Sequence, residues 1–136
     1  LCIFGIYFSL IRKTRDYFKK LNSTLLAAIN EICRTTPNSK PRHWAGNLYT
    51  TARNKNQLMD EPSFRELADF ITEEIEVFAS KLCIDKNNGR LSINNMWINI
   101  LKNKDSMDQH CHPNSLFTGA YHNLTDISMA WLISSS

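Results

Sequence analysis

Residues 91–100 read LSINNMWINI. Apolar side chains recur there at every second position, a period typical of a β-strand, and the phase changes at residues 94–95, which predicts a β-bulge. Polar residues 102–108 predict a turn, so that this strand and the histidine-containing stretch after it form one antiparallel hairpin-like unit. A further strand is predicted over residues 116–124.

Two helical stretches precede this strand. Apolar side chains spaced three and four residues apart predict one amphipathic helix over about residues 12–34 and a second over residues 64–82. Pro62 and Ser63 begin the second helix, and residues 85–89 end it. Both apolar stripes are predicted to be core. Helices followed by strands in this way indicate an α+β fold.

Residues 109–121 read QHCHPNSLFTGAY and contain the candidate metal ligands. His110 and His112 are one residue apart, so on a strand they would point to the same face and Cys111 to the other. Imidazole suits iron, copper and zinc, and the spacing alone does not name the metal. His43 has no partner at a usable spacing and is predicted to be a surface or turn histidine.

A wider pattern around these histidines resembles a known enzyme family. It consists of Trp97-x-Asn99, His110-x-His112-Pro113, Ser115 and Thr118-Gly119-Ala120-Tyr121. The pattern is similar to the signature W-x-N, H-x-H-P, S and S-G-V-Y-Y-L of the 2-oxoglutarate/Fe(II)-dependent oxygenases of phage and marine bacteria. The likeness covers most of residues 44–124 and departs at Thr118, Ala120 and His122.

The resemblance implies a fold and a chemistry. The fold would be a truncated double-stranded β-helix, or jelly roll, with its first strands in residues 91–136 and mainly helical support in residues 1–90. The chemistry would be a hydroxylase-type oxidation of an unknown substrate, with Fe(II) as cofactor and 2-oxoglutarate as cosubstrate. His110 would be the first metal ligand. His112 stands where related motifs have a carboxylate, so either three histidines bind the metal or the carboxylate comes from further along.

Three other residues are candidates for binding the cosubstrate. Tyr121 is expected on a strand facing the same cavity as the histidines, as a hydrogen-bond donor. Asn99 and Ser115 are weaker candidates, for contacts that support the metal ligands. No residue is assigned a catalytic role of its own.

The chain is interpreted as a single domain, residues 1–136, that forms the N-terminal part of a longer protein. A complete β-helix needs about eight strands, more than residues 91–136 supply. In this family the distal histidine and the basic residue that anchors 2-oxoglutarate would follow residue 136. We therefore expect these residues alone to bind metal weakly and to produce no succinate, although the parent protein is predicted to be an enzyme.

Composition limits the possible partners. Lys and Arg number 16 against 13 Asp and Glu, and this dispersed net charge of +3 is no nucleic-acid signature. The 4 cysteines are widely spaced and imply no disulfide framework. Residues 1–10, LCIFGIYFSL, are too short for a membrane span, which needs roughly 20 residues, and are predicted to be a buried first strand. A cytoplasmic protein with no membrane partner is expected.

Two alternatives to the oxygenase remain open. The first is a non-catalytic β-fold module, such as a phage structural or binding protein, which would bind neither Fe(II) nor Co(II) even at full length. The second is a cupin-like protein that binds another metal ion. Metal binding by the parent protein separates the first alternative from the other two hypotheses.

Overall fold

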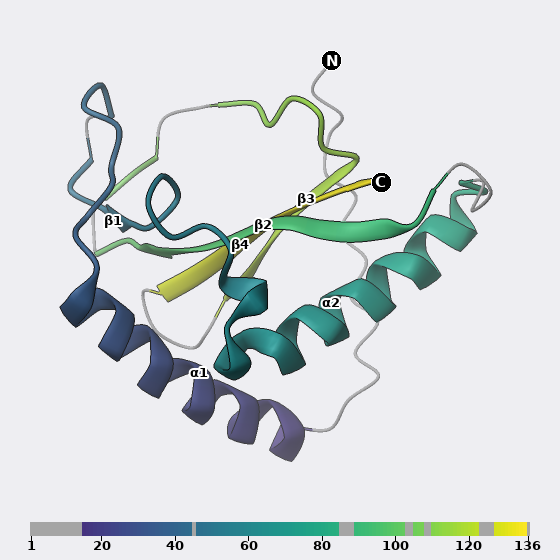
Figure 1. The fold of residues 1–136 in the computed structure, drawn as a ribbon, viewed down its shortest axis with the longest axis horizontal. Coiled ribbons are helices and arrows are strands. Elements are labelled where there is room, and N and C mark those ends of the chain that lie inside the picture. The colour runs from purple at the N-terminus through teal and green to yellow at the C-terminus, as the bar shows by residue number, and fades with distance from the viewer. Residues whose placement is uncertain are drawn as a thin grey trace.

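A computed structural model provides the fold. It describes residues 15–44, 46–84, 89–102, 105–107, 110–122 and 127–135. Within these ranges, two α-helices lie beneath a four-stranded sheet (Figure 1). The first strand predicted within residues 1–10 lies outside the described residues.

Both predicted helices are confirmed. Helix α1 spans Arg15–Thr35 and helix α2 spans Pro62–Lys81, with Pro62 in the first turn, where its missing N–H costs no helical hydrogen bond. A short 3-10 helix, η1, covers Leu58–Asp60 just before α2. Of the helices in the described part of the chain, none is both long and apolar enough to cross a bilayer.

The strands form one antiparallel sheet in the order β1-β2-β4-β3. The strands are β1 at Tyr49–Thr50, β2 at Leu91–Ile100, β3 at Phe117–His122 and β4 at Ile127–Ser135. The β2–β4 register shifts between Ile93 and Asn95, as the predicted bulge requires. The predicted α+β class is confirmed, whereas the jelly roll stays a prediction because the described residues form this single sheet.

The predicted hairpin is wrong, because β4 lies between β2 and β3. Strand β4 carries apolar side chains on both faces, which suits an interior strand. Strand β3 is shorter and exposes Thr118 and His122, which suits an edge. Since both pair antiparallel with β4, β2 and β3 run parallel. The chain between them, residues 101–116, is therefore a crossover connection. The polar turn predicted in it does begin after β2, where the Asp105 N–H donates to the Lys102 oxygen at 2.9 Å, but it does not lead into a hairpin.

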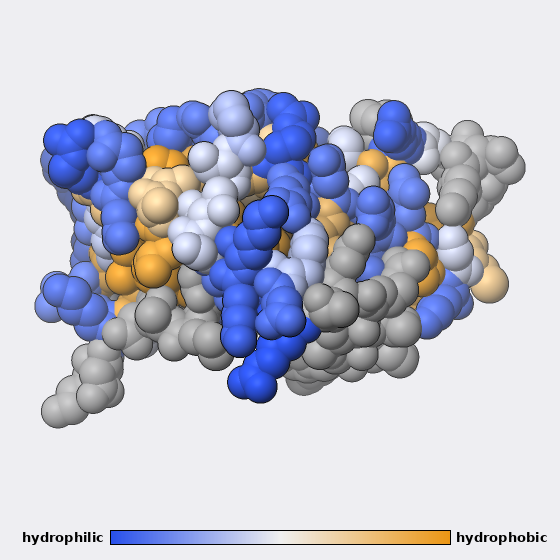
Figure 2. All heavy atoms as spheres, turned by 90° about the horizontal axis from the view of Figure 1, so that it is seen from below, coloured by the Kyte–Doolittle hydropathy of each residue, from blue (hydrophilic) through white to orange (hydrophobic). Residues whose placement is uncertain are grey.

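The strand register separates the side chains of the sheet into two faces. One face packs on the helices and supplies Met96, Ile98, Met129 and Ile133 to the core. From the helices the core receives Leu21, Leu25, Ile29, Ile32, Phe64, Leu67, Ala68 and Ile71. Seen from below, the helices present mostly hydrophilic side chains to solvent, with hydrophobic ones showing between them (Figure 2).

The opposite face, here called the outer face, carries no helix among the described residues. Trp97 and Asn99 of β2 point to it, next to Ala130 of β4. Trp97 is only 7% exposed and Asn99 only 2%. Among the described residues, loops rather than helices cover this part of the sheet, and residues 105–107 and 110–116 of the crossover belong to one of them (Figure 1). The candidate functional site lies here.

Candidate functional site

The two candidate metal ligands meet above the outer face. The ring centroids of His110 and His112 are 4.8 Å apart, and the ring planes are at 86°. The rings do lie together as predicted, although in the crossover and not on a strand. Asn114 follows with φ of 68°, a left-handed conformation that asparagine tolerates, and turns the chain toward β3.

The spacing of the two rings fits one shared metal ion. Each imidazole nitrogen would be about 2.1 Å from the ion and about 1.1 Å from its own ring centre, so ligands at right angles place the centroids roughly 4.5 Å apart, and tetrahedral ligands roughly 5.2 Å. The observed 4.8 Å lies between these values. The centroid spacing is therefore compatible with two imidazoles on one transition-metal ion, and it equally suits edge-to-face packing of two rings.

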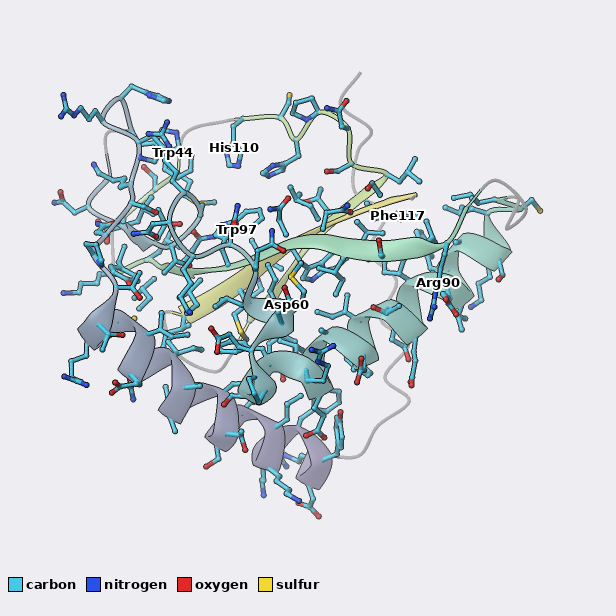
Figure 3. The ribbon with its side chains drawn as sticks, viewed as in Figure 1. Trp44, Asp60, Arg90, Trp97, His110 and Phe117 are labelled. Atoms are coloured by element: carbon cyan, nitrogen blue, oxygen red, sulfur yellow. The ribbon has the colours of Figure 1, made fainter. Side chains whose placement is uncertain are left out.

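Two tryptophans flank the histidines. The Trp44 ring lies 5.3 Å from that of His110, and the Trp97 ring 5.7 Å from that of His112. These four residues form an aromatic row that joins the loop before β1, the crossover and strand β2. Figure 3 shows Trp44 and His110 on the side of the sheet away from the helices. The row attaches the histidines to the outer face.

Burial holds His112 in the form that binds metals. Desolvation, and then the neighbouring His110, lower the pKa of His112 below its ordinary value of 6.5. Neutral imidazole is the form that donates a nitrogen lone pair to a metal. His112 is therefore largely neutral at pH 7.

Acidification is expected to destabilise the metal-free protein through His112. The unfolded chain binds this proton more tightly than the folded chain does, so the stabilisation is present above about pH 6.5 and is lost as the pH falls through the lowered pKa. Urea unfolding at about pH 7.5 and about pH 5 should show a smaller acid-induced loss for His112→Gln than for the wild type. His43→Gln, at an exposed turn histidine, should behave as the wild type. Equal losses in all three proteins would contradict the prediction.

Asn99 lies on the same face as Trp97, two residues further along β2. Its side chain is 2% exposed, and its Oδ1 atom has no hydrogen-bond partner among the described residues. A buried acceptor without a donor costs about 1–3 kcal/mol. Because an amide can turn over and exchange its oxygen with its NH₂ group, the position offers either an acceptor or a donor to a ligand.

Replacing Asn99 with leucine, which has the same branched arrangement of side-chain atoms, is expected to leave the free energy of unfolding within about 1 kcal/mol of the wild type, because removal of the unpaired acceptor offsets the larger size of the two methyl groups. Thr51→Val is the matched control: Thr51 is fully buried, and its hydroxyl oxygen accepts a hydrogen bond from the Ile98 N–H at 3.2 Å. That variant should lose about 1–3 kcal/mol. Equal losses in urea unfolding would show that the Asn99 amide is satisfied in solution.

Tyr121 and Ser115 are not part of the aromatic row. The expectation that Tyr121 faces the same cavity as the histidines is contradicted by the register, which turns its side chain toward the helices. Its hydroxyl donates to Asn22 Oδ1 of α1 at 2.7 Å, and burial raises its pKa. Ser115 is half-buried in the crossover, and no hydrogen bond between described residues joins it to the histidines.

No third metal ligand joins the pair within the described ranges. No group of three His, Cys, Asp or Glu side chains there could hold a metal ion. Cys111 is exposed between the two histidines, and His122 is exposed at the end of β3. The described residues therefore provide two ligands at most.

Comparison with protein-family models, with curated proteins and with solved structures found no match. The contacts of the aromatic row and of Asn99 are therefore the observations that bear on function. Sequence reasoning gave Trp44 no role in the site beyond its part in the resemblance. The available signal was a large aromatic residue in a polar loop, since such side chains usually pack against something.

Proposed function

We propose that His110 and His112 bind Fe(II) in the centre of a 2-oxoglutarate-dependent oxygenase and that the parent protein hydroxylates a substrate C–H bond. The observation that carries the proposal is the 4.8 Å spacing of the two imidazole rings, which suits one shared ion. The family resemblance of the surrounding motif supports iron and 2-oxoglutarate in particular. Imidazole is a usual ligand for non-haem iron.

The same proposal extends the fold and the ligand set. The four-stranded sheet would be part of a double-stranded β-helix in the parent protein. The resemblance implies a distal histidine and a basic residue that pairs with a 2-oxoglutarate carboxylate, both later in the parent chain. A two-ligand site alone would hold Fe(II) weakly.

When bound, iron, 2-oxoglutarate and dioxygen would supply oxidative decarboxylation coupled to hydroxylation of the substrate. The protein's own residues have simpler tasks. His112 presents a neutral, half-buried ring, and Trp44 and Trp97 hold the two imidazoles against the sheet while His110 stays exposed. The Asn99 amide, with its NH₂ group turned toward the site, would donate to a carboxylate of the cosubstrate.

Co(II) titration tests the metal site. Co(II) added to the 136-residue chain should bind saturably at one site and quench tryptophan fluorescence, because Trp44 and Trp97 both contact the ligand rings. Trp131, on the helix side of the sheet, supplies the unquenched background. No saturable binding at neutral pH, even at the high Co(II) concentrations that a weak two-ligand site requires, would overturn the proposal.

Turnover of 2-oxoglutarate tests the reaction. The parent protein should form succinate only when both Fe(II) and 2-oxoglutarate are present. The 136-residue chain should form none above background, since it offers two ligands in its described part. A parent protein that binds Co(II) but forms no succinate would retain the metal site and refute the oxygenase.

A further inference from the structure

Lys40 lies at the centre of the loop that carries Trp44. Its ammonium group donates to the backbone oxygen of Trp44 at 2.7 Å and to that of Gly46 at 2.6 Å. The side chain is half-buried, and the two oxygens come from the same loop. One cation thus closes the loop by binding two of its carbonyl groups.

The backbone around Lys40 is itself fixed to strand β1. Asn38 Oδ1 accepts from the Lys40 N–H and from the Thr50 N–H, both at 3.0 Å. The Ser39 N–H donates to the Thr50 oxygen at 2.9 Å. The ammonium group therefore projects from a backbone that the sheet holds in place.

From this loop, two contacts reach the histidine crossover. The Trp44 ring lies 5.3 Å from the His110 ring. Gly46 packs directly on the backbone of Ser106, so closely that a Cβ atom at Gly46 would come within 2.2 Å of the Ser106 oxygen. The two residues that make these contacts, Trp44 and Gly46, are the ones whose backbone oxygens accept from the Lys40 ammonium group.

We propose that Lys40 is a positioning residue: by holding the loop closed it keeps Trp44 against His110 and so fixes the orientation of that imidazole. The claim that Lys40 orients a metal ligand rests on the proposed function. The claim that Lys40 fixes the orientation of the His110 ring does not depend on metal. Without the ammonium group both carbonyls lose their donor, the loop opens and His110 loses the Trp44 ring, keeping only that of His112 beside it.

The sign of the effect on metal binding separates positioning from simple electrostatics. An ammonium group repels a divalent cation, so removal of its charge alone would tighten Co(II) binding. Loss of positioning weakens binding instead, by about tenfold if Lys40 acts like other residues that orient a metal ligand. Lys40→Met is the informative variant because methionine keeps most of the length of the side chain and lacks both the charge and the donors.

The experiment compares Lys40→Met, Lys40→Arg and Lys55→Met by NMR of the histidine rings without metal and by Co(II) titration. Lys55 is also half-buried but pairs with Glu61 at 2.5 Å, so Lys55→Met is the matched control. In Lys40→Met the ring resonances of His110 should move toward those of the exposed His43. In Lys40→Arg, which keeps charge and donors, they should stay near those of the wild type. Lys40→Gln takes its place, with a smaller shift, if Lys40→Met does not fold.

A Trp44→Leu background tests the route of the effect. There Lys40→Met should shift the His110 resonances no further, because the ring that transmits the effect is gone. The inference is overturned if the His110 resonances of Lys40→Met equal those of the wild type. It is also overturned if Lys40→Met shifts these resonances as much in the Trp44→Leu background as it does in the wild type. If the wild type binds no Co(II), the metal proposal fails while the resonances still decide the role of Lys40. If the wild type binds Co(II) and Lys40→Met binds it as tightly or more tightly, Lys40 does not position a metal ligand.

Discussion

Replacing His110 with alanine is expected to weaken Co(II) binding to the chain by at least about 100-fold, because loss of a direct ligand exceeds the 10–100-fold effect of losing a residue that only orients one. His112→Ala should have an effect of the same size. The described residues offer no third ligand that could compensate. Tryptophan quenching by Co(II) should then disappear over the range that saturates the wild type.

His43→Ala is the matched control for this experiment. It removes an imidazole of the same kind from an exposed turn, and its Co(II) affinity should equal that of the wild type. Urea unfolding of all three variants separates loss of a ligand from loss of fold, since the crossover contributes little to the helix-side core. If His110→Ala and His112→Ala bind Co(II) as the wild type does, the metal lies elsewhere, and the assignment to this pair is wrong.

The second large effect is expected at Gly119, where substitution by alanine should lower the free energy of unfolding by about 3 kcal/mol, at the upper end of the usual cost of overpacking. Gly119 pairs with Trp131 across β3 and β4. A Cβ atom at Gly119 would lie 2.2 Å from Cζ2 of the indole ring and 2.7 Å from Cε2. The indole packs against the core and is too rigid to move aside without disturbing it.

Thr118→Val provides the control, because Thr118 is the neighbouring residue and is exposed on the outer face. Its effect should stay within about 0.5 kcal/mol. A double-mutant cycle with Trp131→Leu should show that the two positions are coupled, since the smaller side chain leaves room for the added methyl group. A loss below about 1 kcal/mol in Gly119→Ala would mean that the indole is free to move. The glycine of the Thr118-Gly119-x-Tyr121 motif would then need another explanation.

The helices and the bulge were predictable because each depends on residues close together in the sequence. The apolar spacing and Pro62 predict α2, and the phase change at Asn94-Asn95 predicts the bulge. Strand pairing is different, because it depends on competition between distant segments. Strand β4 outcompetes β3 for the place beside β2, since it is longer and apolar on both faces.

The wrong prediction for the direction of the Tyr121 side chain follows from the wrong prediction that β2 and β3 form a hairpin. On a hairpin, counting residues from His112 is a reasonable way to assign faces. Across a crossover the count carries no information, and Tyr121 points to Asn22 on the helix side. The proximity of His110 and His112 was predictable from their spacing, whereas the contacts of Trp44 and Lys40 with other segments depend on the folded loops.

The place of β4 in the sheet also sets when the site can form. The crossover ends in β3, and among the described strands β3 pairs with β4 alone. Residues 110–112 thus leave the ribosome before the strand that fixes their position does. Pairings between segments so far apart in the sequence form late in folding, because their loop-closure entropy must be overcome first. The nascent chain can complete its two helices early, but the histidine pair reaches its place on the outer face only after β4 has inserted.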